Sequence, residues 1–146
     1  MASKVTIRLS ATPEDLPGLT GRVLDRLDSY AFPGEDLYEK AGSYWWTAFR
    51  GRVPVGFAGL RVFSKENYGF LCRAGVAPAV RGRGIHRRLI SSRVRHARLL
   101  GLSQLITYTA VDNVSSSNNL IRAGFQLYDP ANPWVSETVL YWLKEL

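Results

Sequence analysis

Arginine and glycine alternate at Arg81-Gly82-Arg83-Gly84, after a segment with strand character and before one with helix character. The free N–H groups of a first helical turn and the helix dipole attract anions, and glycines let a phosphate approach the backbone. Arg81 and Arg83 add full positive charges at the same place. The segment therefore predicts a phosphate-binding turn. The plainer alternative is a basic helix start whose glycines only relieve a tight turn.

The spacing excludes two common nucleotide-binding motifs. A Walker loop needs a four-residue gap and a Gly-Lys-Ser/Thr ending, and a Rossmann fingerprint needs a third glycine and a distal acid. The chain has neither pattern around Gly82 and Gly84.

Residues 76–86 instead resemble the acyl-CoA pyrophosphate loop of the GNAT superfamily of N-acetyltransferases. The family pattern is Val-x-Pro, two or three residues, and then Arg/Gln-x-x-Gly-x-Gly/Ala. Arg81 and Gly84 match it, and His86 stands where the family usually has Gly or Ala. His86 either crowds the pyrophosphate or donates a hydrogen bond to it.

A second match lies downstream, where Asn113 is followed eleven residues later by Gly124-Phe125, with Ser116 at the family's small position. The resemblance covers nearly the whole chain. It implies a single N-acetyltransferase domain over residues 1–146 with the α/β (α+β) GNAT acyl-CoA N-acyltransferase fold. In that fold, helices flank a central mixed, mostly antiparallel sheet.

The resemblance also implies which residues hold acetyl-CoA, the expected cosubstrate. Backbone groups of Gly75 and Val76 would pair with the pantetheine amides, and Asn113 and Ser116 would border the pantetheine arm. In the family a bulge in the fourth strand frees backbone groups where the thioester sits; Gly75 would permit it, and the Val76 backbone is a candidate oxyanion donor. The pyrophosphate would be held by Arg81, Gly82, Arg83, Gly84, Ile85 and His86.

The family's catalytic tyrosine, seven residues after the Asn, is replaced by Leu120. The general acid toward the leaving thiolate is therefore missing, and the catalytic residues stay unassigned. Tyr108 and Tyr128 are weak candidates for a proton path through water.

Hydrophobic periodicity and turn residues predict the order strand, helix, three strands, helix, strand, helix, strand, strand. A capping pattern at Thr12 predicts a helix to about Tyr30, and Gly101 is the expected C-terminal cap of the second helix. The predicted strands are residues 5–9, 44–49, 53–63, 68–76, 105–111, 125–128 and 134–143. The second and third predicted helices run from about residue 82 to Gly101 and over residues 115–123.

The chain has 146 residues, 46% of them hydrophobic, and a net charge of +7 to which fifteen arginines contribute. This favours one globular domain with an anionic partner. The N-terminus alternates in polarity, no apolar run is long enough for a membrane span, and a lone Cys72 cannot form a thiolate metal site. We expect a cytoplasmic protein with no bound metal and no membrane contact. The sequence leaves the formation of a homodimer undecided.

Three functions stay in view. The first is acetyl transfer from acetyl-CoA to a primary amine of a small molecule or protein by direct attack. The second is acyl-CoA binding without catalysis, because Leu120 replaces the family's catalytic tyrosine. The third is a nucleic-acid-binding module. It is the least favoured, because the arginine-rich helix has no Asn or Gln to read bases. The arginines from Arg88 to Arg98 are expected to form a solvated helix face. Alternatively, Arg87 or Arg88 contacts the 3′-phosphate of coenzyme A.

The expected acceptor entrance lies between residues 35–44 and residues 129–134, where aromatic and acidic side chains cluster outside regular structure. Tyr38 and Trp134 are the aromatic residues expected to line it.

Overall fold

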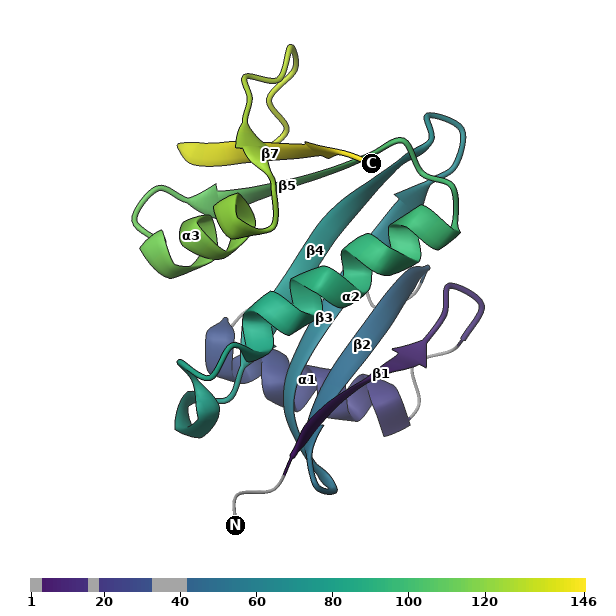
Figure 1. Ribbon diagram of the computed structural model, residues 1–146, viewed down its shortest axis with the longest axis vertical. Coiled ribbons are helices and arrows are strands. Elements are labelled where there is room, and N and C mark those ends of the chain that lie inside the picture. The colour runs from purple at the N-terminus through teal and green to yellow at the C-terminus, as the bar shows by residue number, and fades with distance from the viewer. Residues whose placement is uncertain (1–3, 16–18, 33–41) are drawn as a thin grey trace.

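The computed structural model describes residues 4–15, 19–32 and 42–146. Its elements follow the predicted order, and Figure 1 shows a sheet crossed by one long helix in front and a shorter helix behind. They are β1 Val5–Ala11, α1 Leu19–Ala31, β2 Ser43–Arg50, β3 Val53–Phe63, β4 Tyr68–Val76, the 3-10 turn η1 Pro78–Val80, α2 Ile85–Leu99, β5 Gln104–Ala110, α3 Val114–Arg122, β6 Gln126–Leu127 and β7 Val139–Glu145.

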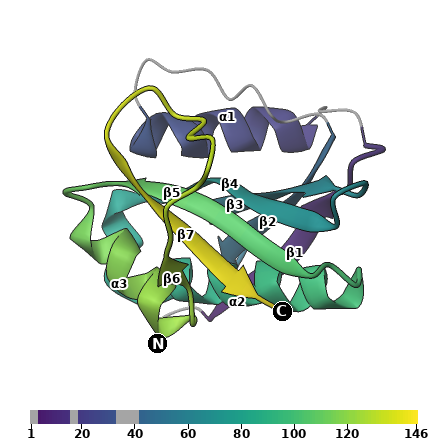
Figure 2. The same cartoon turned by 90° about the horizontal axis from the view of Figure 1, so that it is seen from above.

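The sheet has the strand order β1-β2-β3-β4-β5-β7-β6. Every neighbouring pair is antiparallel except β4 and β5, which run parallel. Figure 2 shows the sheet between two helical layers, with α1 over one face and α2 and α3 over the other. The predicted α/β fold with a mixed, mostly antiparallel sheet is therefore confirmed.

Two apolar clusters, one on each face, hold these layers together. The larger one lies under α2 and includes Trp46, Leu71 and Leu89, while the smaller one lies under α1 and includes Trp45 and Phe57. Trp45 and Trp46 are adjacent in β2 and therefore point to opposite faces, so each anchors one cluster. Burial of this apolar surface is the main free-energy source that fixes the layers.

The two largest errors in the predicted boundaries are the starts of α1 and β7. Thr12 and Asp15 do make capping-type hydrogen bonds, with Thr12 N–H donating to Asp15 Oδ2 at 2.7 Å and Asp15 N–H to the Thr12 carbonyl at 3.0 Å. They close a turn, however, and residues 12–15 are not helical, while α1 spans Leu19–Ala31. Likewise, β7 begins at residue 139, five residues later than expected.

Candidate active site

The sheet separates between β4 and β5, the one parallel pair. Their pairing covers only Tyr68 to Phe70 of β4 and ends at Phe70 opposite Ile106, although both strands continue further. Figure 1 shows the two strands diverging toward the side where α3 lies. Beyond the last pair, the Thr107 hydroxyl donates to the Leu71 carbonyl at 2.8 Å. Within the described ranges, no strand pairs with the rest of β4 on this side.

A bulge in β4 lies just beyond this point. Ala58 pairs with Ala74 and Leu60 pairs with Leu71, so Gly59 of β3 faces both Cys72 and Arg73. The expectation that Gly75 carries the bulge is therefore wrong, because Gly75 pairs in register with Phe57. A bulge adds one residue to a strand and changes the side to which the following side chains point.

The bulge determines which groups of β4 point to which face. Leu71 and Ala74 pack in the cluster under α2, whereas Cys72 packs in the cluster under α1. Arg73 also points to the α1 face, because its guanidinium pairs with the Asp28 carboxylate of α1, Nε to Oδ1, at 3.2 Å. Strict alternation would place Arg73 on the opposite face from Cys72.

The gap between the strands holds a cavity of about 300 Å³ that reaches both faces of the sheet. On one side it is lined from α2 and α3, and on the other it reaches Phe32, which follows α1, and the segment between β6 and β7. The lining residues include His86, Ile90, Arg93, Asn113, Ser116 and Leu120 on the first side, and Phe32, Phe70, Arg73, Tyr108 and Glu137 on the second. A ligand entering from the α2 side can therefore meet one entering from the α1 side.

The predicted phosphate-binding turn connects β4 to α2. Gly82 and Gly84 both have a φ of +78°, a conformation that glycine adopts without strain, and Gly84 is the N-cap of α2. Added Cβ atoms at these glycines would meet nothing within 4 Å, so the backbone is open to a ligand. Arg81 Nε donates to the Val76 carbonyl at 3.0 Å, which fastens the turn to the end of β4.

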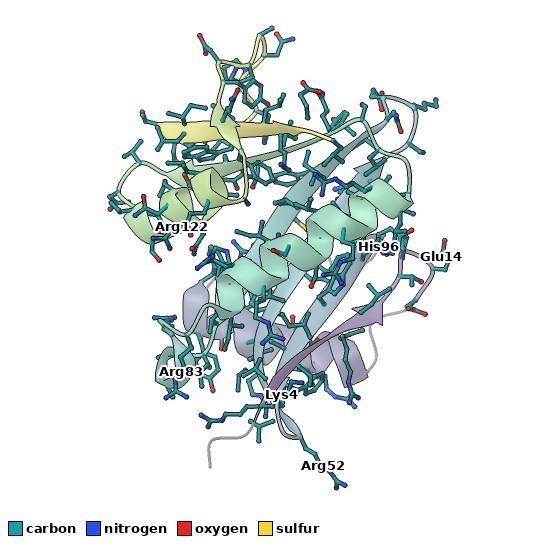
Figure 3. All side chains as sticks on the ribbon, viewed as in Figure 1. Lys4, Glu14, Arg52, Arg83, His96 and Arg122 are labelled. Carbon is teal, nitrogen blue, oxygen red and sulfur yellow. The ribbon has the colours of Figure 1, made fainter. Side chains whose placement is uncertain are left out.

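Arg83 lies on this turn at the N-terminal end of α2 (Figure 3), and it is exposed, as are Arg81 and both glycines. Arg88, in the following turn of the helix, donates through Nη1 to the Val5 carbonyl at 3.0 Å. That side chain therefore links β1 to α2 while it remains exposed, as expected for a solvated face, and its contact with the 3′-phosphate stays a prediction.

His86 is held inside the cavity as a neutral donor. Its Nδ1 accepts a hydrogen bond from the Asn119 amide at 3.1 Å, which leaves the ring proton on Nε2. Burial, with a smaller effect from the positive charge of Arg93, lowers the pKa of His86 from 6.5 to about 4. The imidazole is therefore neutral at physiological pH.

This shift predicts a loss of stability in mild acid. The unfolded chain protonates His86 below about pH 6.5 and the folded protein resists protonation to about pH 4, so the free energy of unfolding falls as pH drops through that window. We expect wild type to lose about 2 to 3 kcal/mol more than His86→Gln between pH 7 and 4.5, measured by urea unfolding. Parallel pH profiles for the two proteins would contradict the assignment.

Asn113 and Ser116 lie at the start of α3. Asn113 is the N-cap, and its side-chain oxygen accepts from the Ser116 N–H at 3.1 Å, so its clearest role is to begin the helix. Both residues line the cavity, as the sequence analysis predicts for the pantetheine arm, and their ligand contacts stay predictions. Leu120 is buried in the same wall, so the family's tyrosine position does face the cavity.

The other predicted site residues lie at different distances from the cavity. Gly75 and Val76 follow Ala74, the last β4 residue of the lining, and pair with β3. Their backbone roles stay predictions. Tyr108 lines the cavity and stacks on Phe70.

Tyr128 lies outside the lining and contacts Tyr141 edge to face. Burial raises the pKa of Tyr128, as do the neighbouring Tyr141 and Tyr68. Tyr128 is therefore a poorer proton donor than a free tyrosine.

The α1 side of the cavity carries an ion pair that the sequence analysis missed. Asp28 is 2% exposed, and Arg73 pairs with it while the Arg73 guanidinium carbon lies 3.6 Å from the centre of the Phe32 ring. Trp134 contacts Phe70 from the segment before β7, with ring centroids 6.5 Å apart. Residues 35–41, including Tyr38 and the acids Glu35, Asp36 and Glu39, lie outside the described residues.

Within the described ranges, no group of three or more His, Cys, Asp or Glu side chains is arranged to bind a metal ion. None of the helices in those ranges is long and apolar enough to span a bilayer.

Comparisons with known proteins agree with this geometry. A family model described as the acetyltransferase (GNAT) family matches residues 13–125. A mycothiol acetyltransferase of Streptomyces scabiei is 31% identical over 105 residues, which are 72% of this chain and 33% of that protein. One of Nocardia farcinica is 33% identical over 95 residues, 62% of this chain and 31% of that protein. The chain thus spans about a third of the length of these curated relatives.

Solved structures share the fold over nearly the full chain. The ribosomal-protein-S18-alanine N-acetyltransferase of Escherichia coli superposes with a TM-score of 0.76 at 14% identity, covering 97% of this chain and 94% of that one. A Bacillus subtilis acetyltransferase in complex with CoA gives 0.72 at 16% identity, covering 98% and 99%. With the family model matching most of the chain and the fold agreeing throughout, the chain belongs to the acetyltransferase (GNAT) family.

Proposed function

We propose that the protein transfers the acetyl group of acetyl-CoA to a primary amine by direct attack, without an acetylated enzyme. The observation that carries this proposal is the cavity through the sheet, which extends from His86, two residues after the glycine-rich, basic turn, on one face to an aromatic and charged surface on the other. Two substrates bound from opposite faces would meet at the β4 bulge. Such an arrangement suits a reaction in which one attacks the other.

The α2 side suits coenzyme A. The open N–H groups from Gly82 to His86 and the start of the α2 dipole would take the pyrophosphate, with Arg81 and Arg83 adding charge. The pantetheine arm would pass along β4, between α2 and α3. Asn113 and Ser116 border that path.

In the reaction, the amine nitrogen attacks the thioester carbonyl carbon and the carbon–sulfur bond then breaks, with its electron pair leaving on sulfur. The proton lost by the amine passes to water. Backbone N–H groups near the bulge, or that of Val76, would stabilise the carbonyl oxygen as negative charge develops on it. A coenzyme A thiol has a pKa near ~8.5, so its thiolate is a tolerable leaving group even with Leu120 in place of a tyrosine.

Calorimetric titration with acetyl-CoA, followed by release of free thiol with a panel of amines, tests the proposal. The panel includes small amines and peptides with free N-termini, because the relatives are named for mycothiol and one structural neighbour for a ribosomal-protein alanine. We expect micromolar binding that weakens with salt, since the contacts are charged. Absence of acetyl-CoA binding would overturn the proposal, and tight binding of random duplex DNA in its place would favour the nucleic-acid alternative.

Trp134→Ala tests the acceptor side. Trp134 is 43% exposed and extends the aromatic surface of Phe70. Loss of one aromatic contact should raise the acceptor KM about three- to tenfold and leave acetyl-CoA affinity unchanged. Tyr30→Ala, an exposed aromatic residue of α1 outside the cavity lining, is the matched control. Equal loss of both affinities in Trp134→Ala would indicate a damaged fold and contradict the prediction.

A further inference from the structure

Arg93 is a buried cation on the cavity wall. It is 2% exposed, although it belongs to the arginine-rich helix α2, whose arginines the sequence pattern predicts to be solvated. Its Nε donates to the Leu89 carbonyl at 3.2 Å and its Nη1 to the Gly59 carbonyl at 3.1 Å. Both acceptors are neutral, and no carboxylate of the described residues pairs with Arg93.

These two bonds do not account for a buried charge. A guanidinium has five N–H donors, and the two carbonyls take two of them. Burying an ion without a counter-ion costs several kcal/mol, whereas two backbone carbonyls need only neutral donors. The remaining donors of Arg93 belong to a side chain that lines the cavity.

Arg93 lies at the end of the expected pantetheine path that is farther from the pyrophosphate turn. His86, Ile90 and Arg93 line the cavity along one stripe of α2, and the rise of 1.5 Å per residue places Arg93 about 10 Å from His86 along the helix. Gly59, to which Arg93 bonds, faces the β4 bulge at Cys72 and Arg73. A ligand anchored at the N-terminus of α2 would thus reach Arg93 with the end that carries sulfur.

Among the described residues that line the cavity, Arg93 is the buried cation with no carboxylate in an ion pair. His86 on α2 is neutral, Cys72 on β4 is buried and forms no disulfide, and Arg73 is paired with Asp28 of α1. Tyr108 of β5 and the exposed Glu137 line the α1 side. Burial lowers the pKa of Arg93 to about 10, against a smaller opposite effect of the nearby Cys72, so Arg93 remains protonated at neutral pH.

We propose that Arg93 is a catalytic residue whose free guanidinium N–H groups contact the sulfur of coenzyme A and stabilise the thiolate as it leaves. The inference rests on the proposed function. When the carbon–sulfur bond breaks, the electron pair goes to sulfur and the fixed positive charge of Arg93 stabilises it without proton transfer. Electrostatic stabilisation thereby replaces the tyrosine acid that Leu120 displaces.

The direct test compares the binding of coenzyme A with that of desulfo-coenzyme A, which lacks the thiol, by calorimetry between pH 6 and 9.5. If Arg93 stabilises the thiolate, the bound thiol has a pKa at least about one unit below the free value near ~8.5. Coenzyme A should then gain about tenfold in affinity over the desulfo compound as pH rises. Arg93→Lys should keep most of this gain, and Arg93→Met should lose it.

A matched control is Arg95→Met, which removes an exposed arginine from the same helix and should behave as wild type. With a saturating acceptor, Arg93→Met should lower kcat about a hundredfold while the KM for acetyl-CoA changes little. Identical pH profiles for the two ligands in wild type would overturn the proposal, even if Arg93→Met fails to fold. A change confined to the acceptor KM would do the same. Failure of wild type to bind coenzyme A at all would instead reject the proposed function.

Discussion

Gly84→Asp should lower acetyl-CoA affinity by at least about a hundredfold. Gly84 is the N-cap of α2, and its Cβ position faces open space at the turn expected to hold the pyrophosphate. A carboxylate there would satisfy the free N–H groups of the first turn and repel the phosphates. Two like charges about 4 Å apart near a protein surface cost about 4 kcal/mol, which is ample for this loss.

Gly101→Asp is the matched control for this variant. Gly101 has a φ of +77° and open space around its Cβ, so the backbone strain of the substitution is the same, but it follows the opposite end of α2. Both variants should fold, with similar losses in thermal midpoint, and only Gly84→Asp should lose binding in calorimetry. Unchanged affinity in a folded Gly84→Asp would refute the assignment of the turn.

The features that the sequence predicted well depend on local chemistry. The bounds of β3 and β4 agree with those expected, because period-two alternation and flanking turn residues act over a few residues. The same holds for Gly101, whose positive φ ends α2 as a C-terminal cap. The basic, glycine-rich turn likewise needs only its own residues to form an anion site.

The features that the sequence analysis missed depend on contacts between distant segments. The position of the β4 bulge is set by the register of β4 against β3. No feature of the sequence near Gly75 indicates that the bulge lies elsewhere in the strand. Arg93 is buried because Gly59, 34 residues away, presents a carbonyl to it. His86 is likewise fixed by Asn119, 33 residues away. One clue to Arg93 was available, since it adjoins Val94 and follows Leu89 by four residues, on the apolar side of α2.

Arg73→Met should lower the free energy of unfolding by about 3 kcal/mol. The Asp28 carboxylate is 2% exposed, and the substitution removes the guanidinium that pairs with it at 3.2 Å. The substitution removes a charged partner from a buried carboxylate, which is why the cost exceeds that of a surface pair. The contact between Arg73 and the Phe32 ring is lost as well.

Urea unfolding of a double-mutant cycle measures the coupling between Arg73 and Asp28. Arg73→Met with Asp28→Asn should be more stable than Arg73→Met alone, because the neutral amide is cheaper to bury than the carboxylate. Arg61→Met is the matched control, since Arg61 is an exposed arginine that lies 5.3 Å from the Phe63 ring centre, and it should cost less than about 1 kcal/mol. Equal costs for Arg73→Met and Arg61→Met would mean that the ion pair contributes little. The bulge would then be held by strand pairing and packing alone, and the α1 side of the cavity would not depend on the charge of Arg73.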